Sequence, residues 1–197
     1  MKYFIVAIIC FAMSDIQAQN ENDVFPYSEI PVYPENYGAG NVIARMIDGL
    51  GYRFYWATEG LREEDLKYKP SEDSRQTDET IEHLFGLSEM IVNAAKDEPN
   101  IRPSVSTGMN FNDFRKGTLN NLKKASEIMM NKTESEISDL QVKFQRGDNT
   151  NSFPLWNLLN GPLSDALYHT GQVVAFRRAS GNPINSKVNV FMGKNRD

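Results

Sequence analysis

Apolar side chains recur at alternating intervals of four and three residues in the segment that starts at Asn41. The residues that follow this spacing are Ile43, Ile47, Leu50, Phe54, Ala57 and Leu61. Positions spaced in this way share one side of an α-helix, so the pattern predicts an amphipathic helix that buries this seam. The polar stretch "REEDLKYKP" comes next, and Pro70 cannot continue a helix, so the helix is expected to end before it.

Three further segments show the same helical period. The second helix is expected to begin near Thr77, because "TDET" offers a capping hydroxyl and acidic residues for the first turn. Helices are also predicted over residues 112–130 and 154–180, the last with a kink where Gly161 and Pro162 interrupt it. Four long helices joined by loops predict an all-α four-helix bundle.

The remaining segments are predicted to be irregular or to form short strands. Residues 20–40 contain three prolines and several aromatic side chains, which indicates an extended arm that packs on the domain. Residues 97–110 are expected to form a loop, whereas "DLQVKFQ" followed by "RGDN" is compatible with a small hairpin. The expected division is therefore an arm over residues 20–40, a helical domain over 41–185 and a tail over 186–197.

The first residues have the order of a secretory signal peptide. Lys2 precedes an apolar run over residues 3–13, which is too short to cross a bilayer as a helix. We expect a signal peptide over residues 1–19 and export to the periplasm or medium, with no stable membrane association after cleavage. An uncleaved anchor and a buried helix are the alternatives. Cys10, the single cysteine, lies in this segment, so a mature chain would contain no disulfide and no cysteine ligand.

The amino-acid composition and net charge limit the classes of partner that the protein is expected to bind. The chain has 197 residues, 40% of them hydrophobic, which is enough for one domain with a real core. Its formal net charge is −5. Nucleic acids and anionic membranes attract basic surfaces, so neither is expected as a partner. The exposed faces of a helical bundle would permit a homodimer.

A strip of polar side chains interrupts the most apolar of the predicted helices. Asp165, His169 and Gln172 are spaced by four and three residues and therefore share one side of the fourth helix. This helix is apolar nearly all round, so it is expected to be the most buried, and a buried carboxylate needs a partner. Together with His83, the other of the two histidines, Asp165 and His169 could hold one Zn, Ni, Fe or Mn ion.

Structural explanations of the same residues stay open. Asp165 and His169 could form a hydrogen-bonded or ionic pair inside the core, and His83 could bind a loop carbonyl. Gln172 is expected to bind backbone or to support the histidine instead of a metal. Arg177 and Arg178 are expected to be surface charges that favour the helix C-terminus.

Three stretches resemble one known family. They are "GLREEDLKYKP" after the first helix, "TIEHLFGLSE" on the second and "LSDALYHTGQVVAFRRASGNP" on the fourth. Over residues 41–183 the chain resembles the DinB-like (YfiT-like) metalloenzyme superfamily, which implies a bundle of up-down-down-up order. In that family the second helix carries a histidine where His83 stands. The fourth carries a histidine pair four residues apart, followed by Gly-Gln.

The match on the fourth helix is partial. His169, followed by Gly171 and Gln172, matches the second histidine of the family pair, but Asp165 stands where the first histidine would be. Aspartate binds the same ions, so the resemblance implies a metal site made of His83, Asp165 and His169 that is harder and more anionic than the family's.

Three functions are compatible with these observations. The first is an exported metal-dependent enzyme acting on a small molecule, either hydrolase-like or a thiol-dependent transferase, since known activities of the family resemble thiol-dependent transfer or isomerisation. The second is a non-catalytic bundle that binds a metal or a small ligand. The third is a structural or interaction domain in which Asp165 and His169 form a buried pair.

Overall fold

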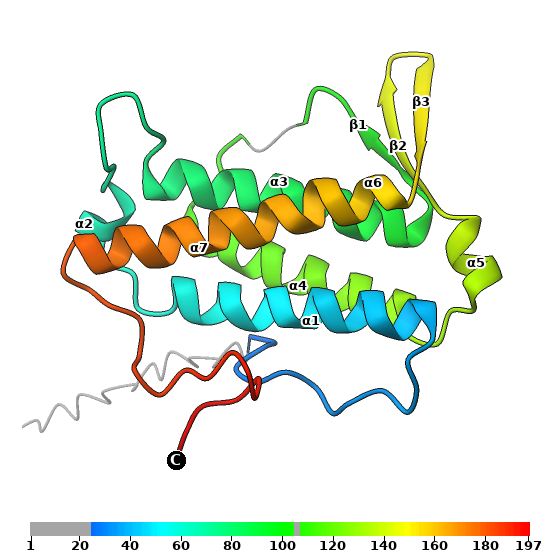
Figure 1. Ribbon diagram of the computed structural model, residues 1–197. Coiled ribbons are helices and arrows are strands. Elements are labelled where there is room, and N and C mark those ends of the chain that lie inside the picture. Colours follow the sequence, from blue (N-terminus) through cyan, green and yellow to red (C-terminus); the bar gives the residue numbers. More distant parts are fainter. Residues whose placement is uncertain (1–24, 105–106) are drawn as a thin grey trace, which may run out of the picture.

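The computed structural model describes residues 25–104 and 107–197. The expected signal peptide and Cys10 lie outside the described residues. Four long helices dominate the fold, namely α1 (Ala39–Thr58), α3 (Thr77–Lys96), α4 (Phe111–Met129) and α7 (Ser164–Ala179). Figure 1 shows that α1 and α7 run in one direction while α3 and α4 run in the opposite one. Both α1 and α3 pack against α4 and α7, so the four helices surround one core.

The core is formed by the apolar seams that the helical period predicts. Ile47, Phe54 and Ala57 of α1 are fully buried, as are Ile81 and Ile91 of α3. At the end of the first seam, Leu61 is only partly buried. From α4 and the last part of the chain come Leu119, Leu122, Met129, Leu158, Leu163 and Val173. The helices predicted from residues 41, 77 and 112 are thus confirmed, with starts that differ by at most two residues, although α1 ends at Thr58, before Leu61.

The predicted interruption of the fourth helix is also confirmed. A short helix α6 (Trp156–Leu158) leads into a π-helical turn η1 (Leu159–Leu163), and α7 begins directly after it. Gly161 has φ −96° and ψ −110° there, which is not helical, and Pro162 follows. Proline removes a backbone donor and crowds the preceding turn, so the helix cannot continue regularly through this point.

A small sheet accompanies the helices. The strands are β1 (Pro99–Ile101), β2 (Gln141–Arg146) and β3 (Asn149–Pro154), in the order β1-β2-β3. The antiparallel pair β2–β3 is the hairpin that "RGDN" suggested. β1 pairs with β2 in parallel, so the expectation of a plain loop over residues 97–110 was wrong, and the all-α class omitted this sheet. β1 has only three residues, and its pairing partner lies about 40 residues further along, which no local pattern can reveal.

The fourth long helix is not the most buried one. Of its residues only Ala166, Thr170, Val173 and Arg177 are buried. Tyr168 is 63% exposed, and Trp156, in the short helix before α7, is 77% exposed. α7 contacts α1 on one side and α3 on the other, and its outer side faces solvent. Apolar residues all round the helix therefore did not mean burial all round.

Two of the stretches that carry the family resemblance meet at one end of the helices. The Asp65 side chain, in the short helix α2 (Glu63–Leu66), is fully buried. It accepts hydrogen bonds from the backbone and guanidinium of Arg62, from Ser180 Oγ at 2.6 Å and from Asn182 Nδ2 at 2.6 Å. The Arg62 guanidinium holds the pKa of Asp65 well below its ordinary value. The contact between these two stretches is therefore a structural junction.

Arg177 extends this junction to α1. It is 4% exposed, which corrects the expectation that it is a surface charge. Its Nη1 donates to the backbone carbonyls of Trp56, Ala57 and Glu59 at 2.9–3.0 Å. These carbonyls lie at the C-terminal end of α1, where no intrahelical donor is available to them. Arg177 thus caps one helix from another, a role that its position at the end of α7 did not reveal.

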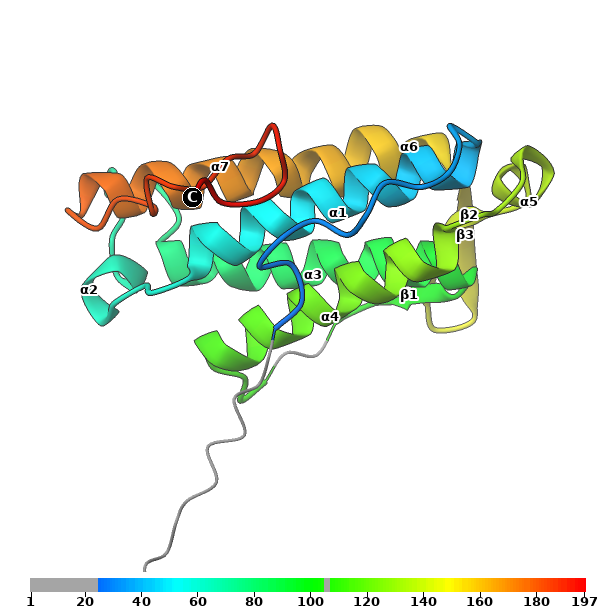
Figure 2. The ribbon, with the colours of Figure 1, turned by 90° about the horizontal axis from the view of Figure 1, so that it is seen from below.

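The arm and the C-terminal segment both lie along the outer side of α1, as Figure 2 shows. Tyr27 of the arm is buried and donates a hydrogen bond to Asp48 Oδ1 at 3.0 Å. Tyr33 and Tyr37 are exposed, so the predicted packing of the arm's aromatic residues holds for only some of them. Among the described residues, no helix has the length and apolar character needed to cross a membrane.

Candidate metal centre

The structure brings together the three residues that the sequence singled out. His83 lies on the second turn of α3, Asp165 on the first turn of α7, and His169 one turn later on α7. Each offers one ligand atom, and these atoms all lie within 4.8 Å of one another. The contact between α3 and α7 creates this cluster, because the residues come from points more than 80 positions apart in the chain. We refer to His83, Asp165 and His169 as the triad.

The carboxylate stands between the two imidazoles. His83 Nε2 is 3.3 Å from Asp165 Oδ2, and His169 Nε2 is 3.4 Å from Asp165 Oδ1. The two rings are perpendicular, with their centroids 4.7 Å apart. Nitrogen and oxygen ligands at about 2.0–2.2 Å from one ion lie roughly 3–3.5 Å from each other. The two imidazole–carboxylate distances match this separation, and all three ligand atoms lie within 4.8 Å of one another, so the arrangement is compatible with one shared divalent ion.

His169 is oriented by its neighbours on α7. Its Nδ1 lies 2.6 Å from Gln172 Oε1, and Gln172 Nε2 donates to the hydroxyl of Tyr168 at 3.2 Å. Because the amide oxygen only accepts, the proton of a neutral His169 is on Nδ1, and Nε2 keeps its lone pair on the side of Asp165. This is the supporting role predicted for Gln172. The contribution of Tyr168 was missed, although its spacing of four residues from Gln172 was the available signal.

The triad lies at the surface, although the sequence pattern predicted that it would lie in the core. The side chains are 33% exposed for His83, 44% for Asp165 and 14% for His169. The argument from a buried, unpaired carboxylate therefore fails, and the convergence of three ligand atoms replaces it. Exposure also leaves one side of the cluster open to solvent and to small molecules.

Charge and burial keep His83 suited to bind a cation. Partial burial lowers the pKa of His83, and the positive charge of Arg75 adds to this, while its contact with Asp165 opposes it. A lowered pKa favours the neutral imidazole at pH 7, which is the form that coordinates metals. The alternative in which His83 binds a loop carbonyl is replaced by a contact of its Nε2 with Asp165. The pair of Asp165 and His169 is present, half-exposed instead of buried.

Comparison with known proteins bears on the fold. No family model matches the chain, and no curated protein matches it either. Among solved structures, the crystal structure of a DinB-like protein, YjoA from Bacillus subtilis, is similar with a TM-score of 0.55 and 14% sequence identity. The similarity covers 78% of this chain and 99% of that chain. Because the similarity covers most of this chain at low identity, it concerns the fold.

Proposed function

Because this chain has a DinB-like fold, we propose that it is a DinB-like divalent-metal-binding protein whose ion is held by His83, Asp165 and His169. The observation that carries this proposal is the convergence of three ligand atoms from two helices within 4.8 Å. We further propose that the protein is a metal-dependent enzyme acting on a small molecule, either hydrolase-like or a thiol-dependent transferase.

The donor set decides which ions suit the site. Two imidazoles and one carboxylate are ligands for Zn, Ni, Fe and Mn. Bound there, a divalent ion would supply Lewis acidity that lowers the pKa of a water or thiol sharing the site. The carboxylate of Asp165 cancels one positive charge, which a third histidine would not do. Gln172 holds His169 in the tautomer that presents Nε2, so this ligand needs no reorientation.

The same proposal includes the cellular location, the helix order and the partners of the protein. We infer an exported protein, periplasmic or secreted, in which four helices form a bundle of up-down-down-up order. Its acidic charge of −5 supports the absence of a nucleic-acid partner. The proposal includes no stable membrane association after signal cleavage, and the exposed helix faces are compatible with a homodimer.

A second candidate is a metal-binding protein without turnover. Four cavities in the described part of the chain have other residues in their walls, and none of the four includes a member of the triad. Catalysis on a small substrate usually takes place in a formed pocket. This observation favours binding without chemistry, and the test below separates the two candidates.

The first measurement is metal content by elemental mass spectrometry on protein made without a histidine tag. Wild type is expected to carry close to one equivalent of metal, and His83→Ala and Asp165→Ala are expected to carry almost none. Asp78→Ala is the matched control, because Asp78 is an exposed carboxylate on the first turn of α3. Wild-type protein that stays metal-free after incubation with Zn, Ni and Mn would overturn the proposal.

The second measurement asks for turnover. Metal-loaded protein is assayed with ester and phosphoester substrates and with thiol-transfer substrates. Activity that depends on the metal and disappears in Asp165→Ala supports the enzyme. Stoichiometric metal without any such activity supports the non-catalytic binding protein.

A further inference from the structure

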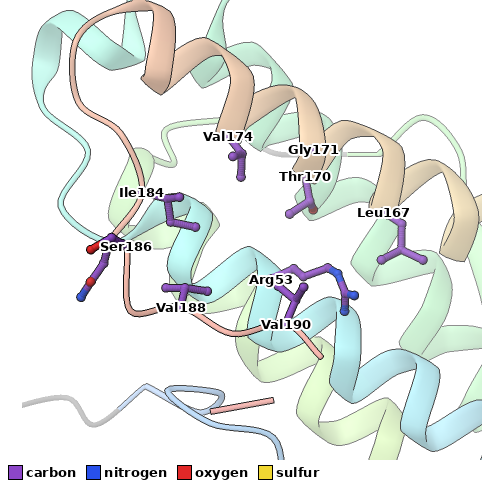
Figure 3. A pocket seen from close by; sticks show the side chains of 10 residues that line it. Arg53, Leu167, Thr170, Gly171, Val174, Ile184, Ser186, Val188 and Val190 are labelled. Carbon is purple, nitrogen blue, oxygen red and sulfur yellow. The ribbon is translucent and has the colours of Figure 1, made fainter. Parts of the chain in front are cut away.

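One of the four cavities lies on the side of α7 that faces away from the triad. Its walls come from α7, from α1 and from the C-terminal segment that follows α7, and Figure 3 shows their side chains pointing into the space between them. The cavity has a volume of about 520 Å³. On α7, Leu167 and Val174 are about half a helical turn away from Asp165 and His169, so the two sites occupy roughly opposite faces. We refer to this space as the α1–α7 groove.

The α1–α7 groove is mainly aliphatic. Its apolar lining consists of Leu167, Val174, Ile184, Val188 and Val190. Thr170 also lines it, but its hydroxyl donates to the carbonyl of Ala166 at 2.7 Å. No aspartate or glutamate lies in the lining. The groove therefore suits an apolar chain and offers no negative charge to a cationic ligand.

One cation, Arg53 of α1, reaches the α1–α7 groove. Its side chain is only partly exposed, and its Nη1 donates to the carbonyl of Gly49 on its own helix at 2.9 Å. Within the described part of the chain, no carboxylate forms an ion pair with Arg53. Figure 3 shows its guanidinium on the side of the groove where Leu167 and Val190 lie. The remaining donors of this guanidinium can take a bidentate anion, which is the geometry that carboxylates match.

The wall formed by the C-terminal segment is fixed in place. Tyr52 of α1 is fully buried, and its hydroxyl donates to Asn195 Oδ1 at 3.0 Å and accepts from the backbone N–H of Asn189 at 3.2 Å. The arm adds a hydrogen bond from Ile30 N to the carbonyl of Gly193 at 2.7 Å. Such anchoring gives the α1–α7 groove a preformed shape, which lowers the entropic cost of binding a ligand.

We propose that the α1–α7 groove binds an amphipathic monocarboxylate, with its apolar chain among the aliphatic residues and its carboxylate on Arg53. The volume lies within the range of about 300–1,000 Å³ that is typical of small-ligand pockets. An aliphatic lining with a single charged group that fixes orientation is the usual composition of such pockets. This site needs neither the metal nor the triad, so it stands independently of the function proposed above.

The proposal is tested by calorimetric titration of the purified protein with decanoate, with 1-decanol as its neutral counterpart. EDTA is present throughout, so that decanoate cannot bind through a metal at the triad. Wild type is expected to bind decanoate with saturation at one site. Arg53→Gln removes the charge and is expected to weaken decanoate binding about tenfold or more, while the affinity for decanol changes less than about twofold, as expected when only a charged contact is lost.

A second variant tests the location without relying on charge. A Cβ at Gly171 would meet no atom within 4 Å, and Gly171 lines the groove, so Gly171→Trp adds bulk there without a backbone clash. It is expected to abolish binding of both ligands. Gly86→Trp is the matched control, because Gly86 is a helical glycine with the same free space on α3, and it is expected to bind as wild type does.

Three results would overturn the proposal. The first is wild-type protein that does not bind decanoate. The second is equal decanoate affinity in wild type and Arg53→Gln, which would remove the carboxylate from Arg53. The third is unchanged binding in Gly171→Trp, which would place the ligand elsewhere. Circular dichroism and thermal unfolding of each variant establish that it is folded, so loss of binding reports on the groove.

Discussion

Replacement of Asp65 by asparagine tests the junction that joins α1, α2 and the end of α7. The carboxylate accepts five hydrogen bonds, three from Arg62, one from Ser180 and one from Asn182. Asparagine has nearly the same shape but no charge, and its amide nitrogen is a donor facing donors. It also leaves the Arg62 guanidinium without its buried partner.

The expected loss of stability is moderate. Leaving buried hydrogen-bonding groups unsatisfied costs about 1–3 kcal/mol. Arg62 is 45% exposed and also pairs with Glu64, so the larger cost of an uncompensated buried charge does not apply. For a chain of this size each kcal/mol lowers Tm by roughly 2–4 °C, so Asp65→Asn is expected to lower Tm by about 2–12 °C. Urea and thermal unfolding followed by far-UV circular dichroism measure this loss. Asp73→Asn is the control, since Asp73 is exposed, and its effect should stay within about 0.5 kcal/mol.

The pH dependence of the free energy of unfolding tests the same role of Asp65 in a second way. In the folded protein the pKa of Asp65 is depressed, chiefly by the hydrogen bond with Arg62. Its contribution to the free energy of unfolding is therefore complete above the ordinary aspartate pKa of about 4 and is lost as pH falls below it. Wild type should lose more stability than Asp65→Asn between about pH 5 and pH 2. A loss below about 0.5 kcal/mol at pH 7, which is the effect of an ordinary surface substitution, or parallel pH curves for the two proteins, would refute this account.

Three further predictions concern the triad and the core. Metal at 100 times its Kd should raise the free energy of unfolding of wild type by about 2.7 kcal/mol, whereas His83→Ala should show no rise in the same urea titration. Gln172→Leu should weaken metal binding about 10- to 100-fold in a competition titration with a chelating dye, because His169 loses its orienting partner; unchanged affinity would contradict that role. Leu122→Ala, at a fully buried position of α4, should cost about 2–5 kcal/mol in urea unfolding, while Tyr37→Ala, at a 97% exposed position, should cost less than about 0.5 kcal/mol.

Some features of the fold could be predicted because they depend on neighbours in the sequence. The seam on α1 and the helix start at Thr77 follow from a period of 3.6 residues and from capping chemistry. The break at Gly161 and Pro162 follows from the missing backbone donor of proline. The spacing of Asp165 and His169 on one side of a helix is equally local.

Other features arise only when distant segments meet. The strand β1 exists because β2 supplies its partner, and Arg177 is buried because the carbonyls at the end of α1 lie beside it. The helix α7 has apolar residues on most of its sides, but only the sides that contact α1 and α3 are covered. Helical periodicity can therefore rank the faces of one helix, but it cannot state which neighbours will cover them.

The same distinction between local and distant contacts applies to the two candidate sites. By itself, the sequence determined that Asp165 and His169 share a helix face and offered His83 as a third ligand, which the family resemblance supported. The tertiary structure decided that the three ligand atoms converge at the half-exposed contact of α3 with α7. It alone created the α1–α7 groove, whose third wall is a segment without any regular pattern. This segment is held in place by hydrogen bonds to Tyr52 and to the arm. Contacts between residues more than 130 positions apart produce no periodic pattern in the sequence, so the groove could not be predicted from it.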